Sequence, residues 1–146
     1  MDMDSFWYLE DEAIADVAFE AYGSNLEAIF YQAGIATANL LTDLNVLTGT
    51  ELRTLKLSKS SEERLLKNYL DEIVYLKDAD LFFIKTIEVS ISSDTNIWNL
   101  TAKFHGDIFD FEKMPMYNDL KAITWHDFSL RQLDDETWKC YVLIDI

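Results

Sequence analysis

The last seven residues, 140–146, read CYVLIDI, an apolar run that carries a single acidic side chain. Apolar groups recur at every second position from just before this run: Trp138, Cys140, Val142 and Ile144. A spacing of two is typical of a half-buried β-strand. It places Asp145 on the face opposite the apolar stripe, where its carboxylate can reach a ligand. The carboxylate of Ile146 can turn toward the same side.

Other segments show the same alternation and are predicted to be strands: 16–21, 87–91, 98–104, 123–125 and, more weakly, 52–58. In the first of these, the odd-numbered residues are apolar and point one way, while Asp16 points the other way. If this strand pairs with the terminal strand, Asp16 is the acidic residue that joins Asp145 and Ile146.

Two segments are predicted to be helices because each opens with a serine followed three residues later by a glutamate. Ser24 and Glu27 form the first capping box, and Ser60 and Glu63 form the second. This pattern marks the point at which each helix is expected to begin.

Behind each capping box, apolar residues recur at helical spacing, over 26–44 in the first helix and over 65–76 in the second. Each helix therefore lays one apolar stripe on a core. The outward face of the second helix is expected to carry Lys67, Asp71 and Glu72.

The order of elements is strand, helix, strand, helix and then four strands. This order predicts an α+β fold in which two helices pack on one face of a twisted, mainly antiparallel sheet. No linker rich in proline, glycine or serine divides the 146 residues, so we expect a single domain over residues 1–146.

The composition limits the kinds of function that this protein can have. The net charge is −15, which disfavours direct nucleic-acid binding because contact with a phosphate backbone depends on lysine and arginine. The same charge suits a basic protein partner or bound cations, although it also serves solubility alone. The sequence has no long uncharged apolar run, its first residues are acidic, and its one cysteine, Cys140, lies in an apolar stretch. We therefore expect a cytoplasmic protein with no membrane span and no disulfide.

Asp16, Asp145 and Ile146 would form a set of ligands made only of oxygen. Such a set suits Ca²⁺, Mg²⁺ or Mn²⁺ rather than Zn²⁺, which prefers histidine and cysteine. The alternative is that Asp145 merely ends a strand and Asp16 merely begins a turn, as many solvated surface acids do.

No self-contained catalytic site is evident. The sequence shows no glycine-rich phosphate loop, nucleophile elbow or Ser/His/Asp arrangement. His126 is predicted to lie in a strand. Its role is either structural, which is the simpler alternative, or that of a residue near a metal. His105 is expected at the surface. Lys121 is a candidate contact for an acidic ligand or a nucleotide phosphate.

Five segments in order carry a resemblance to a known family: 16–30 (DVAFEAYGSNLEAIF), 68–76 (NYLDEIVYL), 106–107 (GD), 120–126 (LKAITWH) and 142–146 (VLIDI). Over nearly the whole chain the sequence resembles the archeases. One motif departs from the family's His-Thr-Ala-Asp, because Ala13, Ile14 and Ala15 precede Asp16 here. The resemblance implies a strand-helix-strand-strand module with an insertion.

The resemblance also implies a function, that of an accessory protein which activates the RtcB-type tRNA-splicing RNA ligase. Such a protein promotes guanylylation of the ligase, supports its turnover and binds a divalent cation, most often calcium. The implied metal ligands are Asp16, Asp145 and Ile146. His126, by its place in a family motif, is a candidate neighbour of the metal. Lys121 and Glu72 are further candidates for a place near the metal or for contact with the partner, and a nucleotide could be contacted at the ligase interface.

Two other functions remain open from the sequence. One is a chaperone-like module whose acidic face binds a basic nucleic-acid-modifying enzyme. The other is a small metal-dependent nucleotide hydrolase that uses the same carboxylates to hold a cation.

Overall fold

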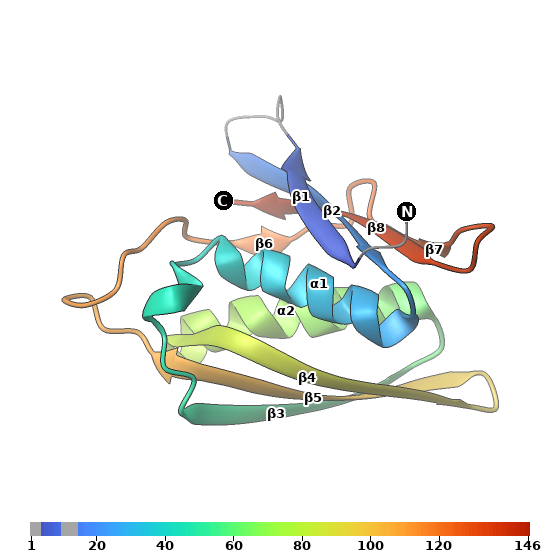
Figure 1. Cartoon of the computed structure of the whole chain (residues 1–146), viewed down its shortest axis with the longest axis horizontal. Helices are drawn as coiled ribbons and strands as arrows, with labels where there is room; N and C mark the ends of the chain where they lie inside the picture. Colours follow the sequence, from blue (N-terminus) through green and yellow to red (C-terminus); the bar gives the residue numbers. More distant parts are fainter. Residues whose placement is uncertain (1–3, 10–14) are drawn as a thin grey trace.

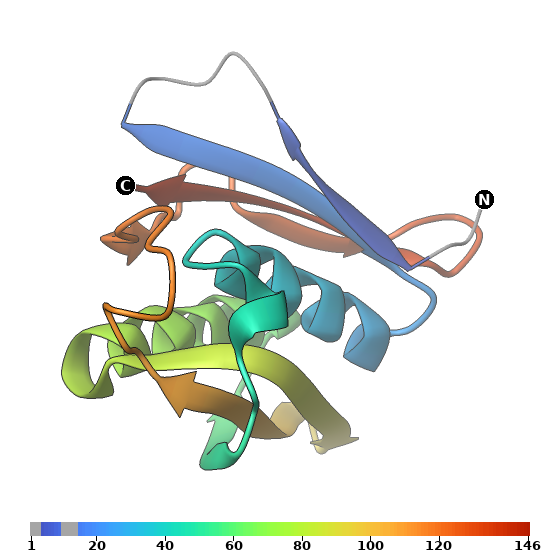
Figure 2. The ribbon, with the colours of Figure 1, turned by 60° about the vertical axis from the view of Figure 1, so that its left-hand side comes forward.

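The computed structural model describes residues 4–9 and 15–146. In chain order the elements are β1 (Ser5–Leu9), β2 (Asp16–Gly23), α1 (Leu26–Asn39), a short 3-10 helix η1 (Leu44–Val46), β3 (Glu51–Lys59), α2 (Glu62–Asp80), β4 (Phe82–Asp94), β5 (Ile97–Ile108), β6 (Ala122–Ile123), β7 (Ser129–Gln132) and β8 (Trp138–Asp145). The two helices lie next to each other between two antiparallel sheets (Figures 1 and 2). Neither described helix combines the length and the apolar character that a membrane crossing needs.

The larger sheet is built around β8, the strand that the terminal apolar run predicts. β2 pairs with one edge of β8, and β1 pairs in turn with β2. β6 and β7 share the other edge of β8. The helix-facing side includes residues with no exposed surface: Phe19, Cys140, Val142 and Ile144. Burial raises the pKa of the Cys140 thiol to about 12, which is typical of an unreactive buried cysteine.

The smaller sheet has the strand order β3-β5-β4 and lies on the other side of the helices (Figure 2). The buried residues of both sheets and both helices form one continuous hydrophobic core. Its largest fully buried side chain is Tyr69 of α2, whose hydroxyl donates a hydrogen bond to the carbonyl oxygen of Phe30 in α1 at 3.0 Å. The two helices are thereby joined at the centre of the molecule.

The α+β class and the packing of two helices against antiparallel strands are confirmed, and the weak strand over 52–58 is present as β3. The structure differs from the expected single sheet, because the strands form two sheets with the helices between them. Alternation along a strand indicates that one face is buried, but it does not identify the neighbouring strand. β1 and β7 were not predicted.

Both helices begin one residue later than the capping boxes predicted. The side chains of Asn25 and Ser61 cap α1 and α2, in place of Ser24 and Ser60. Glu27 accepts a hydrogen bond from a backbone N–H of β4 at 2.8 Å and so links α1 to the smaller sheet. α1 is also shorter than predicted, because it ends at residue 39 and residues 44–46 form η1.

The prediction that Lys67 lies on the outward face of α2 is wrong. Its residue surface is only 8% exposed, and its ammonium group donates to both carboxylate oxygens of Asp71, at 2.8 and 3.0 Å. The same group lies 5.2 Å from the centre of the Trp125 ring. A carboxylate and an aromatic face together compensate the burial of this lysine.

Gly106 and Asp107, at the end of β5, shape the edge of the smaller sheet. A β-bulge in β4 lies opposite Gly106, between Ile84 and Thr86. The buried Asp107 carboxylate accepts hydrogen bonds from the backbone N–H groups of residues 48 and 49 and from the hydroxyl of Thr48. These bonds fix the turn that leads into β3.

We expect Asp107→Asn to lower the free energy of unfolding at neutral pH by about 1–3 kcal/mol, because an amide cannot accept all of these hydrogen bonds. Burial alone would raise the pKa of Asp107, but the hydrogen bonds from Gly49 and Thr48 and the charge of Lys85 hold it below its ordinary value of 3.8. The stabilisation is therefore complete above that value and is lost as the pH falls through the lower pKa of the folded protein. Urea unfolding of both proteins from pH 7 to pH 2 should show the difference between them shrinking below about pH 4. A difference that stays constant would contradict this account.

Candidate functional site

The pairing of β2 with β8 brings the predicted acidic residues together. In this antiparallel pair Asp16 lies directly opposite Asp145. The backbone N–H of Ile146 donates to the carbonyl oxygen of Ala15 at 2.8 Å, so the pairing continues past the last residue of β8. An aspartate from near the beginning of the chain therefore lies beside its final two residues.

Asp16 and Asp145 belong to the outer face of the larger sheet. Residues directly opposite each other in an antiparallel pair share a face, with Cβ atoms about 4.5–5.5 Å apart. The neighbouring Val17 and Ile144 also form a pair, and they face the helices. Both aspartates are half-buried, and in residues 4–9 and 15–146 no lysine, arginine or histidine forms an ion pair with either of them. Two like charges held this close attract a cation.

The other edge of β8 places Lys121 next to the same site. The backbone N–H of Lys121 donates to the carbonyl oxygen of Asp145 at 2.8 Å, and Ala122 is the register partner of Asp145 in β6. Asp145 is thus held by backbone pairing on both sides. Lys121 is an exposed residue.

A buried lysine that the sequence analysis missed anchors the segment before Lys121. Lys77, in the last turn of α2, is 4% exposed and donates to Asp78, to Asp119 and to the carbonyl oxygen of Leu120, at 2.5, 2.7 and 2.7 Å. Burial alone would lower the pKa of Lys77, but the hydrogen bonds and charges of the two carboxylates raise it. Its sequence signal, a basic residue in the last turn of a helix, is too common to indicate this role.

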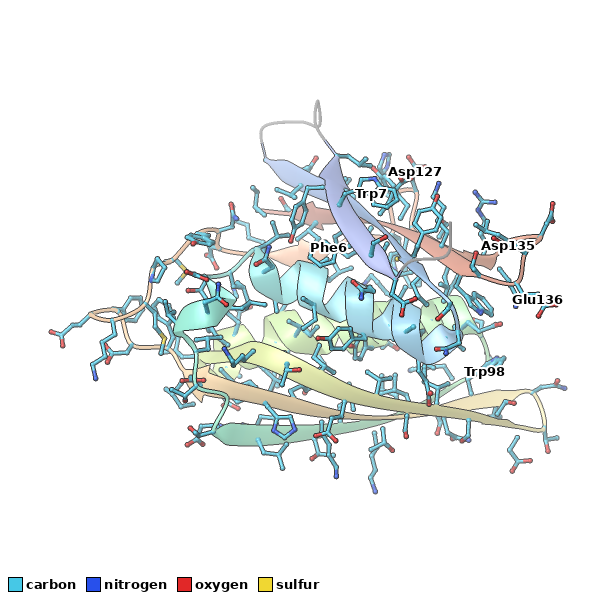
Figure 3. All side chains as sticks on the ribbon, in the orientation of Figure 1. Phe6, Trp7, Trp98, Asp127, Asp135 and Glu136 are labelled. Carbon is cyan, nitrogen blue, oxygen red and sulfur yellow. The ribbon has the colours of Figure 1, made fainter. Side chains whose placement is uncertain are left out.

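His126 does not join the acidic pair in the described part of the chain. It lies in the turn between β6 and β7 rather than in a strand, its side chain is 69% exposed, and its Nε2 lies 3.3 Å from Asp127. Figure 3 shows Asp127 on this turn. His105, which was expected at the surface, is half-buried, and its ring contacts Glu88 at 2.5 Å.

The interactions of Glu72 in the described part of the chain also do not involve the acidic pair. It is half-buried on α2, where burial and the charge of Asp80 raise its pKa. Within residues 4–9 and 15–146, no hydrogen bond or ion pair joins Glu72 to Asp16 or Asp145. Of Lys121, His126 and Glu72, only Lys121 is bonded to the acidic pair in the described part of the chain, and that bond is made by its backbone.

The donor atoms at the site fit a hard cation. The two aspartates supply carboxylate oxygens, and the Ile146 carboxylate is the third candidate ligand, so water would complete the coordination of Ca²⁺ or Mg²⁺. No group of three or more His, Cys, Asp or Glu side chains in residues 4–9 and 15–146 is arranged to hold a metal ion. Ala13 and Ile14, which replace two residues of the archease motif, lie outside the described residues.

Comparisons with known proteins agree with this architecture. The model of the Archease protein family (MTH1598/TM1083) matches residues 6–146. The archease of Pyrococcus abyssi is 30% identical over 92% of this chain and 95% of its own, and that of Pyrobaculum neutrophilum is 31% identical over 95% of both. The solution structure of protein 1598 of Methanobacterium thermoautotrophicum is 26% identical, covers 99% of this chain and 100% of its own, and superposes with a TM-score of 0.82. The chain therefore belongs to the archease family.

Proposed function

We propose that this protein is an accessory factor that activates an RtcB-type tRNA-splicing RNA ligase by promoting guanylylation and turnover of that enzyme. The observation that carries the proposal is the Asp16–Asp145 pair beside Ile146, which agrees with the metal site implied by the archease motifs. Membership of the archease family supports the general role of an accessory protein.

In this proposal Asp16, Asp145 and Ile146 hold one divalent cation, with Ca²⁺ as the first candidate and Mg²⁺ or Mn²⁺ as alternatives. A bound dication would neutralise most of the charge of the carboxylates and could accept a phosphate oxygen. Backbone pairing on both edges of β8 fixes the position of Asp145, and the exposed ammonium group of Lys121 is available to an anionic group at the same edge. The chain would orient the ligand without performing the reaction itself.

The direct test measures the rate at which a purified RtcB-type ligase becomes guanylylated, with and without this protein, at equal cation and GTP concentrations. We expect the protein to raise both this rate and the number of ligation turnovers, and we expect no phosphate release by the protein alone. An unchanged guanylylation rate would reject the activator role.

The same experiment separates the two other candidate functions. Phosphate release by this chain alone would favour a hydrolase. Binding to the ligase that persists in a chelator, with no effect on guanylylation, would favour a chaperone-like module that needs no metal.

A further inference from the structure

One end of the molecule exposes an unusual number of large apolar side chains. Six of the twelve that are exposed in the described part of the chain belong to this end, which we term the apolar end: Val46, Leu81, Ile108, Phe111, Met116 and Tyr117. They come from η1, the junction of α2 with β4, the end of β5 and the loop over 109–121, which lie at the left of Figure 1. Phe111 is the most exposed of them, at 70%. A cluster of this kind is typical of a protein interface.

The loop over 109–121 is held firmly against the fold although it exposes these groups. Its backbone N–H at Tyr117 donates to the carbonyl oxygen of Leu41 at 2.9 Å, and its Pro115 carbonyl accepts from the Thr42 hydroxyl at 2.6 Å. At its other end, Phe109 stacks on Phe83 with ring centres 4.4 Å apart. A loop fixed at this many points presents its apolar side chains in one arrangement, which lowers the entropic cost of binding.

The surroundings of the apolar end are acidic. Carboxylates of five residues lie on or next to the elements that form it: Asp43, Asp78, Asp110, Glu112 and Asp119. Lys77 pairs with both Asp78 and Asp119, so Asp43, Asp110 and Glu112 are the ones that form no ion pair among the described residues. The exposed lysines of the loop are Lys113 and Lys121, while Lys77 is buried and paired. An apolar centre with an acidic border is complementary to a partner surface that has an apolar centre and a basic border.

We propose that the apolar end is the surface by which this protein docks on its ligase partner, through a basic and partly apolar patch of that enzyme. This inference rests on the proposed function and adds where the partner binds. The loop over 109–121 leads directly to Lys121, whose backbone is bonded to Asp145. A partner docked on the loop is thereby brought to the edge of the sheet that carries the acidic pair.

The test compares two isoleucines at opposite ends of the same strand. Ile108 and Ile97 are 45% and 40% exposed, at the end and the beginning of β5. We expect Ile108→Ser and Phe111→Ser each to weaken binding to the purified ligase, measured by calorimetry, by about 30-fold, which is typical of an interface hot spot. Ile97→Ser should bind as tightly as the unchanged protein. Glu112→Lys should slow association of the protein with the ligase, and the slowing should be greatest at low salt.

The outcomes distinguish this inference from the proposed function. If the unchanged protein binds and activates the ligase while Phe111→Ser binds equally well, the docking surface is wrong and the function stands. If the unchanged protein neither binds nor activates the ligase, both are overturned. Self-association of the unchanged protein that Phe111→Ser abolishes would assign the apolar end to a second copy of this chain and would also overturn the inference. Thermal unfolding within about 2–4 °C of the unchanged protein verifies that each variant is folded.

Discussion

Gly106→Ala is expected to lower the free energy of unfolding by about 3 kcal/mol or more, the upper range for overpacking a close contact. A Cβ atom at this position would lie 2.0 Å from the carbonyl oxygen of Phe83 and 2.9 Å from its carbonyl carbon. Both atoms belong to the backbone of β4, so no rotation of a side chain relieves the clash. The strand would have to move away from β5, with loss of its hydrogen bonds around the bulge.

Chemical denaturation at neutral pH measures this effect, with Gly49→Ala as the control. A Cβ atom on Gly49 would lie 3.3 Å from Cδ of Lys85, which is part of a flexible side chain, but the φ of +76° disfavours alanine. The control should therefore lose only about 1–2 kcal/mol, from backbone strain. Equal losses in the two variants would show that the contact with β4 is unimportant.

The pairing of Asp16 with Asp145 could be predicted because several local patterns agree. Period two along β8 separates its aspartate from the apolar stripe, and the same period along β2 separates Asp16. If these two strands are antiparallel neighbours, their acidic ends meet on the face away from the helices. That they are neighbours was only a hypothesis, because alternation does not identify the strand beside β8. The archease motifs then supply the assignment of these residues to a metal, which alternation alone does not give.

Other features could not be predicted from the sequence because they depend on tertiary contacts. Lys67 and Lys77 have the polarity of surface residues, and only the folded chain gives them carboxylate, carbonyl and aromatic partners. Ser24 and Asn25 are both good N-caps, so the choice between neighbours is decided by how the chain enters α1. β1 was not predicted because its sequence, SFWYL, is mostly apolar and does not alternate. β7 is only four residues long.

Asp145→Asn is expected to remove the stabilisation of this protein by divalent cations. A ligand that binds only the folded state stabilises it by about 2.7 kcal/mol at 100 times its Kd. For a chain of this size that corresponds to a rise of about 5–10 °C in the Tm. The unchanged protein should show this rise when Ca²⁺ replaces a chelator, and the variant should not. The variant should also fail to stimulate guanylylation of the ligase.

The direction in which Asp145→Asn changes the unfolding temperature without metal distinguishes loss of a cation site from loss of a structural contact. In a chelator, Asp145→Asn should unfold at an equal or higher temperature than the unchanged protein, because removal of one of two directly opposed like charges is worth about 0.2–1 kcal/mol. Glu136→Gln removes the same charge from the turn at the opposite end of β8 (Figure 3), so it should retain the full response to Ca²⁺. A loss of stability in chelator would indicate that Asp145 serves only to hold the strand end. A response to Ca²⁺ that survives in Asp145→Asn would place the cation elsewhere.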